Sequence, residues 1–353
     1  MNICIVGQYP PQVGGVATYT KQLEEKLISE GHNVYVLTYK QKGEMSSNVF
    51  MAKSINIPLI RGFSFIVSSY FMLNRIVKEY DIDIIHANYI LPPGLVSIFN
   101  KSHAKKVITV HGSDINILPN NKILRHLIKF VLNKADNVYF VSEKLEEKAV
   151  SLCGKRIKEK SEVTPNTVNT EKFHELTGKR KILTSYNKPV VVFIGNLVEQ
   201  KGLTYLLEAK KISETDYTLL IYGDGPEKEK LESYIKSNNM KDTFLMGKTT
   251  MPEKIIPESD IMVLPSVSEG ASIVALESMS CGKALISTNT GNISSIISNE
   301  ENGIMVSPED SESLKDAIDD LVNDEKKREK IGKNARELII NKYSKMNIPY
   351  LVK

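Results

Sequence analysis

With 353 residues, the chain is longer than one ordinary domain of roughly 100–200 residues, so we expect two domains. Hydrophobic residues make up 41% and charged residues 25%, which excludes a disordered or fibrous chain, and the three cysteines form no CxxC pair, which excludes a disulfide framework and a cysteine zinc site. The whole chain has a net charge of +4, but residues 1–180 alone hold 24 Lys and Arg against 16 Asp and Glu. This excess of positive charge favours an anionic partner for the front half, and ordinary variation in surface charge explains it equally well.

The first half of the chain alternates short β-rich apolar runs with longer helical stretches. This pattern is typical of βαβ units that build a parallel sheet. We expect strands at residues 3–7, 33–38, 82–87, 106–110 and 137–141, and helices near 16–30, 63–79, 123–134 and 143–151.

A polar stretch then separates this series from a second one of the same kind. Its expected strands are at 190–195, 218–222, 243–246, 261–265, 284–288 and 304–306, and its helices are near 203–212, 227–238, 272–280 and 311–322. We therefore expect an N-terminal domain at 1–168, a linker at 169–188, a C-terminal domain at 189–342, and a final segment at 343–353 that crosses back to the first domain. Both domains are expected to be α/β, doubly wound and Rossmann-like, and to face each other across a cleft lined by strand ends.

The loop after the first strand, GQYPPQVGG, offers a phosphate-binding turn. Gly14 and Gly15 lack side chains, so backbone N–H groups there can approach a phosphate, and the following helix adds its positive end. The pattern is neither GxGxxG nor the GxxxxGK[ST] loop, and a structural strand–helix turn explains the glycines as well.

Two segments of the second half place charged residues just after expected strands. In EGASIVALE, Glu269 precedes a helix that we expect to begin near Ala271, and Glu277 lies about two turns further on, where carboxylates could accept hydrogen bonds from sugar hydroxyls. In GNLVEQKGL, Lys201 could neutralise a leaving phosphate. Each residue alone is more often an ordinary solvated side chain.

The histidines give no metal site. His111 in VITVHGSD and His86 in DIIHANY lie at or near strand ends, where active-site groups of this architecture occur, but no spacing of histidine and carboxylate makes a convincing metal site.

These segments resemble the retaining glycosyltransferases of family four, which have the two-Rossmann GT-B architecture. Two further segments share the resemblance: PPQVGGVATYTKQLEEKLISEGHNVYVLT at the front and NGIMVSPEDSESLKDAI near the end. The resemblance covers nearly the whole chain in order. It assigns His111, Glu269 and Lys201 to catalysis, at the transferred sugar, the sugar hydroxyls and the diphosphate. It assigns donor binding to Gly14, Gly15, Asn196, Lys201, Gly270, Ala271, Ser272 and Glu277, the last at the ribose. It implies no metal and no cofactor besides the nucleoside diphosphate sugar.

The sequence departs from the family pattern at three places. Asn196 stands where arginine is frequent, Gly270-Ala271-Ser272 replaces GFG or GFP, and Thr290-Gly291-Asn292 replaces a more usual double glycine. The resemblance then implies one phosphate cation fewer, although asparagine recurs at this position in the family, and it leads us to expect an altered sugar pocket. Nothing follows from the third departure.

We accordingly expect a metal-independent enzyme that moves a sugar from a UDP-sugar, or less favoured a GDP-sugar, to a glycan or lipid-linked acceptor in cell-envelope polysaccharide or glycolipid synthesis. The alternatives are a nucleotide-sugar 2-epimerase and an inactive binding subunit of the same fold. We expect no nucleic-acid partner, because the sequence contains no aromatic–basic motif.

The chain has no basic leader, and its longest mostly apolar stretch, 63–73, is shorter than the roughly 20 residues that span a bilayer, so we expect a soluble, cytoplasmic protein. Residues 121–134 mix basic and apolar side chains and could dock peripherally on an anionic membrane at its inner face, although a helix that buries its apolar side explains them better.

Overall fold

The computed structural model describes residues 1–351 except 13, 42–45 and 54–59. It divides into two compact units, one formed by Met1–Asn166 with Met346–Lys353 and the other by Thr167–Lys345. The chain therefore crosses from one unit to the other twice.

The first unit is a parallel sheet, seven-stranded within the described residues, in the order β3-β2-β1-β4-β5-β6-β7. Its strands are β1 (Asn2–Val6), β2 (Asn33–Tyr39), β3 (Val49–Ala52), β4 (Ile84–Asn88), β5 (Lys105–Val110), β6 (Asn137–Phe140) and β7 (Ser161–Val163). Its helices are α1 (Gly15–Ser29), α2 (Ile60–Tyr80), α3 (Leu95–Phe99), α4 (Ser113–Asn116), α5 (Lys122–Lys134) and α6 (Glu143–Cys153), with short helical turns at Ile90–Gly94, Leu118–Asn120, Lys155–Lys160 and Pro349–Leu351.

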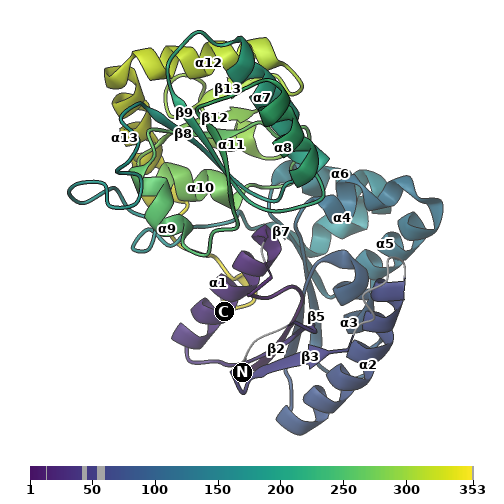
Figure 1. The fold of residues 1–353 in the computed structure, drawn as a ribbon. Coiled ribbons are helices and arrows are strands. Elements are labelled where there is room, and N and C mark those ends of the chain that lie inside the picture. The colour runs from purple at the N-terminus through teal and green to yellow at the C-terminus, as the bar shows by residue number, and fades with distance from the viewer. Residues whose placement is uncertain (13, 42–45, 54–59, 352–353) are drawn as a thin grey trace. The chain divides into compact units, whose positions relative to one another are not determined.

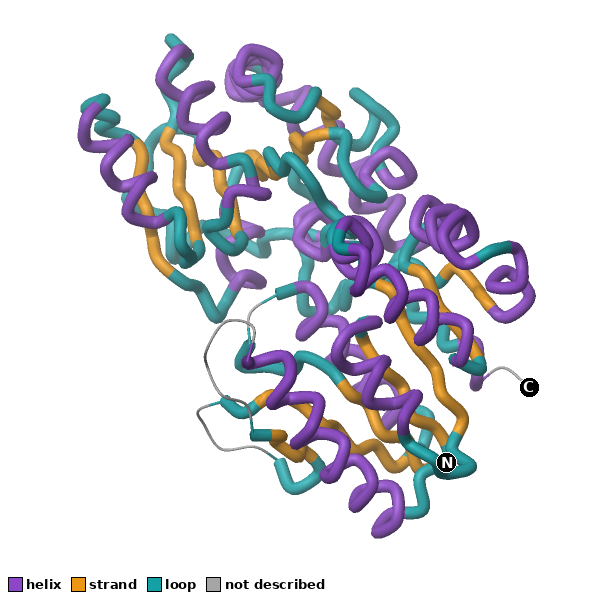
Figure 2. The backbone as a smooth tube through the Cα atoms, turned by 90° about the vertical axis from the view of Figure 1, so that its right-hand side faces the viewer, coloured by secondary structure: helices purple, strands orange, loops and turns teal. Residues whose placement is uncertain are grey.

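Helices cover both faces of this sheet (Figures 1 and 2). Successive residues of a strand point to opposite faces, and Cys4 and Val6 of β1 share one apolar cluster with Leu73 and Ile76 of α2. Because the strands are buried on both faces, they are continuous apolar runs such as NICIV.

The end of the chain is part of this first unit. The Tyr350 hydroxyl and the His86 Nδ1 atom are 3.0 Å apart, and the Tyr350 ring stacks on Tyr139 with ring centroids 6.1 Å apart. Asn347 Nδ2 also donates a hydrogen bond of 3.4 Å to Glu162 Oε1 in β7.

The second unit repeats the same arrangement with a sheet that is six-stranded within the described residues, in the order β10-β9-β8-β11-β12-β13 and parallel throughout. Its strands are β8 (Val190–Ile194), β9 (Thr218–Tyr222), β10 (Thr243–Gly247), β11 (Ile261–Leu264), β12 (Ala284–Thr288) and β13 (Ile304–Val306). Its helices are α7 (Leu203–Ile212), α8 (Lys228–Ser237), α9 (Pro252–Ile255), α10 (Ile273–Ser280), α11 (Ile293–Ile296), α12 (Ser311–Asn323) and α13 (Glu325–Lys342), with turns at Glu199–Lys201 and Ile256–Glu258. Helix α12 packs beside α7, and α13 packs beside α10 (Figure 1).

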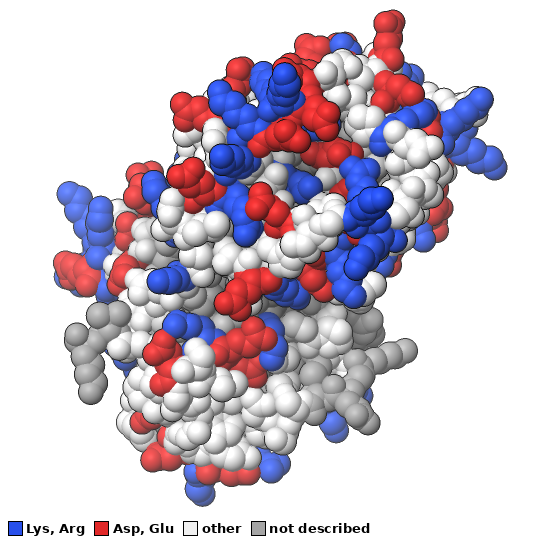
Figure 3. Space-filling model, turned by 90° about the vertical axis from the view of Figure 1, so that its left-hand side faces the viewer, with Lys and Arg blue, Asp and Glu red and all other residues white. Residues whose placement is uncertain are grey.

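The expectation of two doubly wound parallel sheets is confirmed. The segment 169–188 lies within the second unit, where Phe173 and Leu183 are buried and the Glu258 carboxylate accepts three backbone N–H bonds from residues 181–183. On the face drawn in Figure 3, acidic and basic side chains are interspersed. Among the described helices, none combines the length and the apolar character needed to span a bilayer.

Candidate functional site

The order of the strands marks one place in each sheet where a ligand is expected. In the second unit, β8 has β9 on one side and β11 on the other, so the direction of winding reverses between β8 and β11. Open α/β sheets bind their ligands at such a switch point, outside the carboxyl ends of the strands. The loops that follow β8 and β11 carry Lys201 and Glu269.

These two loops are locked together by their backbones. Val267 N–H donates a hydrogen bond of 2.9 Å to the Gln200 carbonyl oxygen. Gly202, with φ of +64°, lies so close that a Cβ atom would be 2.1 Å from the Pro265 carbonyl oxygen. Only glycine fits this position, both for its backbone conformation and for the approach of the second loop.

The locked loops bring Lys201 and Glu269 into direct contact. Lys201 Nζ lies 2.5 Å from Glu269 Oε1, and the two side chains are 23% and 19% exposed. The pair is therefore accessible to a ligand, to which the ammonium can offer hydrogen bonds to phosphate and the carboxylate can accept hydrogen bonds from hydroxyls.

The segment after Glu269 leads into α10. The helix begins at Ile273 and not near Ala271, because Ser272 is its N-cap and accepts a 3.3 Å hydrogen bond from Ala275 N–H. The turn at Gly291 packs closely against Gly270. A Cβ atom on Gly291 would lie 2.6 Å from the Gly270 carbonyl oxygen. The turn at residue 291, for which the sequence indicated no role, thus supports the loop that carries Glu269.

Glu277 lies on α10 and, unlike Lys201 and Glu269, is buried. The residue is 6% exposed, and its carboxylate has no hydrogen-bond partner among the described residues. Burial raises the pKa of Glu277 to about 7, an effect that the Lys172 cation opposes and the Glu253 charge increases. Lys172 Nζ and Glu253 Oε2 are 3.7 Å apart. Lys172 lies in VTPNTVNTEKF, a segment that also resembles the family, but the sequence assigned it no role, and Glu253 lies in no motif.

Asn196 follows β8 with an exposed side chain, and its carbonyl oxygen accepts a 3.0 Å hydrogen bond from Val198 N–H. It adds no positive charge to the loops that carry Lys201.

In the first unit, Gly14 and Gly15 lie where α1 begins. Gly14 is the N-cap residue with φ of +148°, a conformation that favours glycine, and no side chain in the described part of the chain caps the helix. A Cβ atom on Gly14 would meet none of the residues that the structure describes within 4 Å, so the backbone conformation explains this glycine. The first amides of α1 have no partner within the helix.

His111 directly follows β5. It is 9% exposed, its ring meets Tyr19 edge-on with centroids 4.7 Å apart, and its buried Nε2 has no hydrogen-bond partner in the described part of the chain. Burial lowers its pKa to about 3, so the imidazole is neutral at physiological pH. His86 differs, because both ring nitrogens have partners: Tyr350 Oη at 3.0 Å and Thr109 Oγ1 at 2.7 Å.

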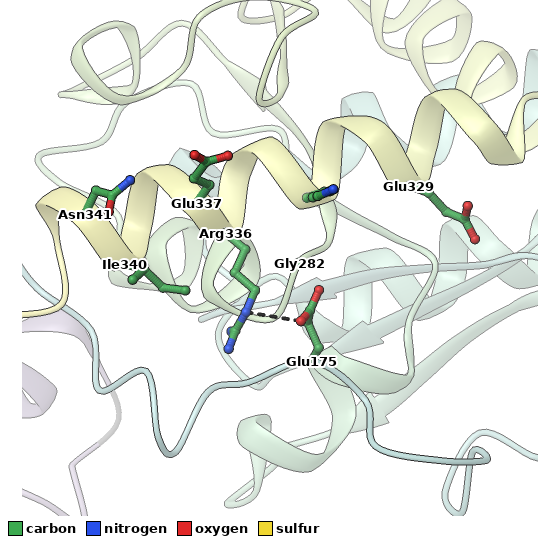
Figure 4. A pocket seen from close by; sticks show the side chains of 8 residues that line it. Glu175, Gly282, Glu329, Arg336, Glu337, Ile340 and Asn341 are labelled. Carbon is green, nitrogen blue, oxygen red and sulfur yellow. Dashed lines mark ion pairs between the residues drawn. The ribbon is translucent and has the colours of Figure 1, made fainter.

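A separate pocket of about 630 Å³ lies along α13 (Figure 4). It contains no expected site residue, and Arg336 Nε pairs with Glu175 Oε2 at 3.2 Å across it. Its lining residues are Glu175, Gly282, Glu329, Lys333, Arg336, Glu337, Ile340 and Asn341. Within the described residues, no group of three or more His, Cys, Asp or Glu side chains could hold a metal ion.

Comparisons with known proteins agree with this architecture. The family model described as Glycosyltransferase Family 4 matches residues 13–172, and the model described as Glycosyl transferases group 1 matches residues 177–338. An uncharacterized glycosyltransferase of Methanocaldococcus jannaschii is 28% identical over 96% of this chain and 93% of its own. The N-acetyl-alpha-D-glucosaminyl L-malate synthase of Bacillus anthracis is 24% identical over 94% of this chain and 91% of its own.

Two solved structures show the same fold. The sucrose-phosphate synthase from Thermosynechococcus elongatus superposes with a TM-score of 0.86 at 22% identity, covering 97% of this chain and 94% of that one. Anabaena HepE in complex with UDP-glucose superposes with a TM-score of 0.81 at 17% identity, covering 97% of this chain and 95% of that one.

Proposed function

The chain belongs to the glycosyltransferases of family 4 and group 1, and from this premise we propose that it transfers a sugar from a nucleoside diphosphate sugar to a hydroxyl of a glycan or lipid-linked acceptor, with retention of configuration. The observation that carries the proposal is the Lys201–Glu269 pair at the switch point of the second sheet.

This pair suits the two parts of such a donor. The diphosphate leaves with negative charge, and Lys201 binds it with charge-assisted hydrogen bonds. Glu269 would be repelled by phosphate, so it accepts hydrogen bonds from the sugar hydroxyls, and the amides around Gly270, Ala271 and Ser272 reach phosphate and sugar. Without donor, the two side chains neutralise each other at 2.5 Å.

Glu277 binds the ribose hydroxyls, since its buried carboxylate has unused acceptor capacity. In the first unit, His111 contacts the transferred sugar through its unpartnered Nε2, and the amides of Gly14 and Gly15 contact the diphosphate. Asn196 contributes to donor binding without a charge.

UDP is the favoured nucleotide, which the HepE complex with UDP-glucose supports, and GDP is the second choice. The reaction is metal-independent, because Lys201 and helix N-terminal amides supply the positive potential that a metal would otherwise give the leaving group. The product belongs to cell-envelope polysaccharide or glycolipid synthesis.

A thermal-shift panel of UDP, GDP, CMP and NAD, with and without EDTA, tests the donor. A ligand that binds the folded state raises the Tm, so UDP or GDP should raise it equally with EDTA present. A shift that EDTA abolishes would refute metal independence, and a folded protein that no nucleotide stabilises would favour the inactive binding subunit.

Variants test the site. Lys201→Ala and Glu277→Ala should each abolish transfer while the fold persists, whereas Lys211→Ala, which removes an exposed lysine of α7 paired with Glu208 at 3.3 Å, should not. Full activity in both site variants would refute the assignment. Donor conversion without any acceptor would instead indicate the 2-epimerase.

The acceptor side includes a peripheral contact with an anionic membrane through residues 121–134, at the inner face in the cytoplasm. Helix α5 buries Ile128, Val131 and Leu132, yet Ile123 and Phe130 are 73% and 39% exposed. Apolar side chains beside lysines and arginine suit a headgroup layer.

The triple change K122E/R125E/K129E should weaken binding to vesicles that contain phosphatidylserine. Neutral phosphatidylcholine vesicles serve as the control. Binding that the triple change leaves intact would refute the membrane contact.

A further inference from the structure

Asp114 of α4 is a fully buried carboxylate three residues after His111 in the chain. Its Oδ1 accepts a 2.8 Å hydrogen bond from Gly112 N–H, and its Oδ2 accepts bonds from His111 N–H at 3.3 Å and from Ile90 N–H at 3.4 Å. Asp114 makes no ion pair in the described part of the chain. One carboxylate thus joins the loop after β5 to the loop after β4 through main-chain N–H groups.

Both loops contain backbone conformations that need support. Gly112 has φ of +126°, and Tyr89, directly before Ile90, has φ of +118°, which is strained for a residue with a side chain. The Tyr89 hydroxyl lies 2.5 Å from Ser113 Oγ, so the residue beside Asp114 also contacts the strained segment. Such strain persists only where the surroundings fix it, and it concentrates at functional sites.

A helix cap alone does not explain this arrangement. The N-cap of the short α4 is Gly112, and Asp114 lies inside the first turn of the helix, so its side chain is not an N-cap. Capping also gives no reason for the bond to Ile90 in another loop. Burying a charge without a cation is unfavourable, and burial accordingly raises the pKa of Asp114 to about 6 although hydrogen bonds from four backbone amides, including its own, oppose the shift.

We infer that Asp114 is a positioning residue for His111, which fixes the main chain of the β5 loop so that His111 Nε2 meets the transferred sugar. The inference rests on the proposed function, which places His111 at that sugar. The Tyr19 ring orients the imidazole and Asp114 holds its backbone, so loss of Asp114 displaces a ring that has no polar side-chain anchor among the described residues.

The test compares Asp114→Asn with His111→Ala and with the double variant. Asparagine keeps the size of the side chain but turns an NH₂ group toward backbone N–H donors. Asp136→Asn is the matched control, because Asp136 Oδ2 accepts a 2.7 Å bond from Lys106 N–H near the opposite end of β5. UDP binding is measured by calorimetry, and UDP release is measured from UDP-glucose, UDP-galactose, UDP-N-acetylglucosamine and GDP-mannose, with GDP release for the last.

We expect D114N to lower turnover about 10- to 100-fold, the size of effect that a small misplacement causes, with nucleotide affinity unchanged. The double variant should be no slower than H111A, because Asp114 acts through His111. Losses that multiply, an equal loss of nucleotide affinity, or turnover like that of D136N would each overturn the inference.

Amide exchange separates this inference from the proposed function. Peptides that cover residues 89–93 and 110–114 should exchange faster in D114N than in the wild type, whatever the enzyme does, and equal exchange overturns the positioning role. If the wild type releases nucleotide from none of the four donors, the proposed function is refuted instead. If D114N fails to fold, Asp114→Ser, which keeps one acceptor, should give an intermediate loss of turnover; wild-type turnover would overturn the inference.

Discussion

We expect donor binding by the wild type to depend on pH around neutrality, and we expect that replacing Glu277 by Gln removes this dependence. Burial raises the pKa of Glu277 to about 7, so this carboxylate changes charge in the physiological range. An ionised carboxylate accepts hydrogen bonds from the ribose hydroxyls, whereas the protonated form must give up part of that capacity. Donor affinity should therefore fall as the pH drops through about 7.

The magnitude follows from the pKa. A group with a pKa of about 7 is roughly 10% ionised at pH 6 and roughly 90% ionised at pH 8. Apparent affinity scales with the competent fraction, so the Kd should improve about tenfold between these values, or about 1.4 kcal/mol. In E277Q a neutral acceptor replaces a charged one, which should weaken binding at pH 8 by about 1 kcal/mol and leave no step.

Calorimetric titration with UDP-glucose at pH 6, 7 and 8 measures this step. UDP itself is unsuitable, because its terminal phosphate titrates with a pKa of about 6. Asp114 also titrates near this range, since burial raises its pKa to about 6, so the E277Q variant isolates the contribution of Glu277. Glu232→Gln on the exposed face of α8 is the control. A step that persists in E277Q, or a flat wild-type profile, would refute the reasoning.

Four further outcomes are expected. E277Q should have a higher Tm than the wild type at pH 8 and not at pH 4. The raised pKa of Glu277 contributes stability that is fully present below about pH 4.5 and is lost as the pH rises through about 7. The free energy of unfolding should change by about 3 kcal/mol over this range. Lys172→Met should raise the midpoint of the UDP-glucose profile and Glu253→Gln should lower it, since the Lys172 charge lowers and the Glu253 charge raises the pKa of Glu277; an unmoved midpoint would contradict this cause. Lys201→Ala should weaken UDP binding by roughly 1.5–3 kcal/mol, measured by calorimetry, and an unchanged Kd would remove Lys201 from the diphosphate site. Gly291→Ala should lower the Tm and the turnover together, because its Cβ would lie 2.6 Å from the Gly270 carbonyl oxygen, and wild-type values for both would show that the turn yields freely.

The strands could be predicted from the sequence because most of them are buried on both faces. Runs such as VVVFI in β8 and TLLIY in β9 are continuous and apolar, and their observed bounds match the expected ones within a residue. The edge strands β3 and β7 escaped prediction, since they are short and β7 reads only SEV. Helix α13 was also missed, because its buried stripe is sparse, with Ile331, Ala335 and Ile339 spaced four residues apart in a polar segment.

The candidate site could be predicted only in part. Lys201 and Glu269 were each recognised in a motif, but they are 68 positions apart, and their contact depends on β8 and β11 being neighbours. Lys172 and Glu253 influence Glu277 across the fold, and although Lys172 lies in the family-like segment VTPNTVNTEKF, no local pattern pointed to either role. Asp114 stood in VITVHGSD, yet its bond to Ile90 joins two loops that only the fold brings together.

The return of residues 346–351 to the first unit determines how the protein can be divided. A single cut after Asn166 would leave the units covalently joined at Lys345–Met346. Removing residues 346–353 would leave the second unit intact. It would remove the contacts of Tyr350 with His86 and Tyr139, so a C-terminal deletion would destabilise the first unit. An autonomous first unit is therefore best built as a fusion of 1–166 to 346–353, and the hydrogen bond between Glu162 and Asn347 shows that a short linker suffices to join the two pieces.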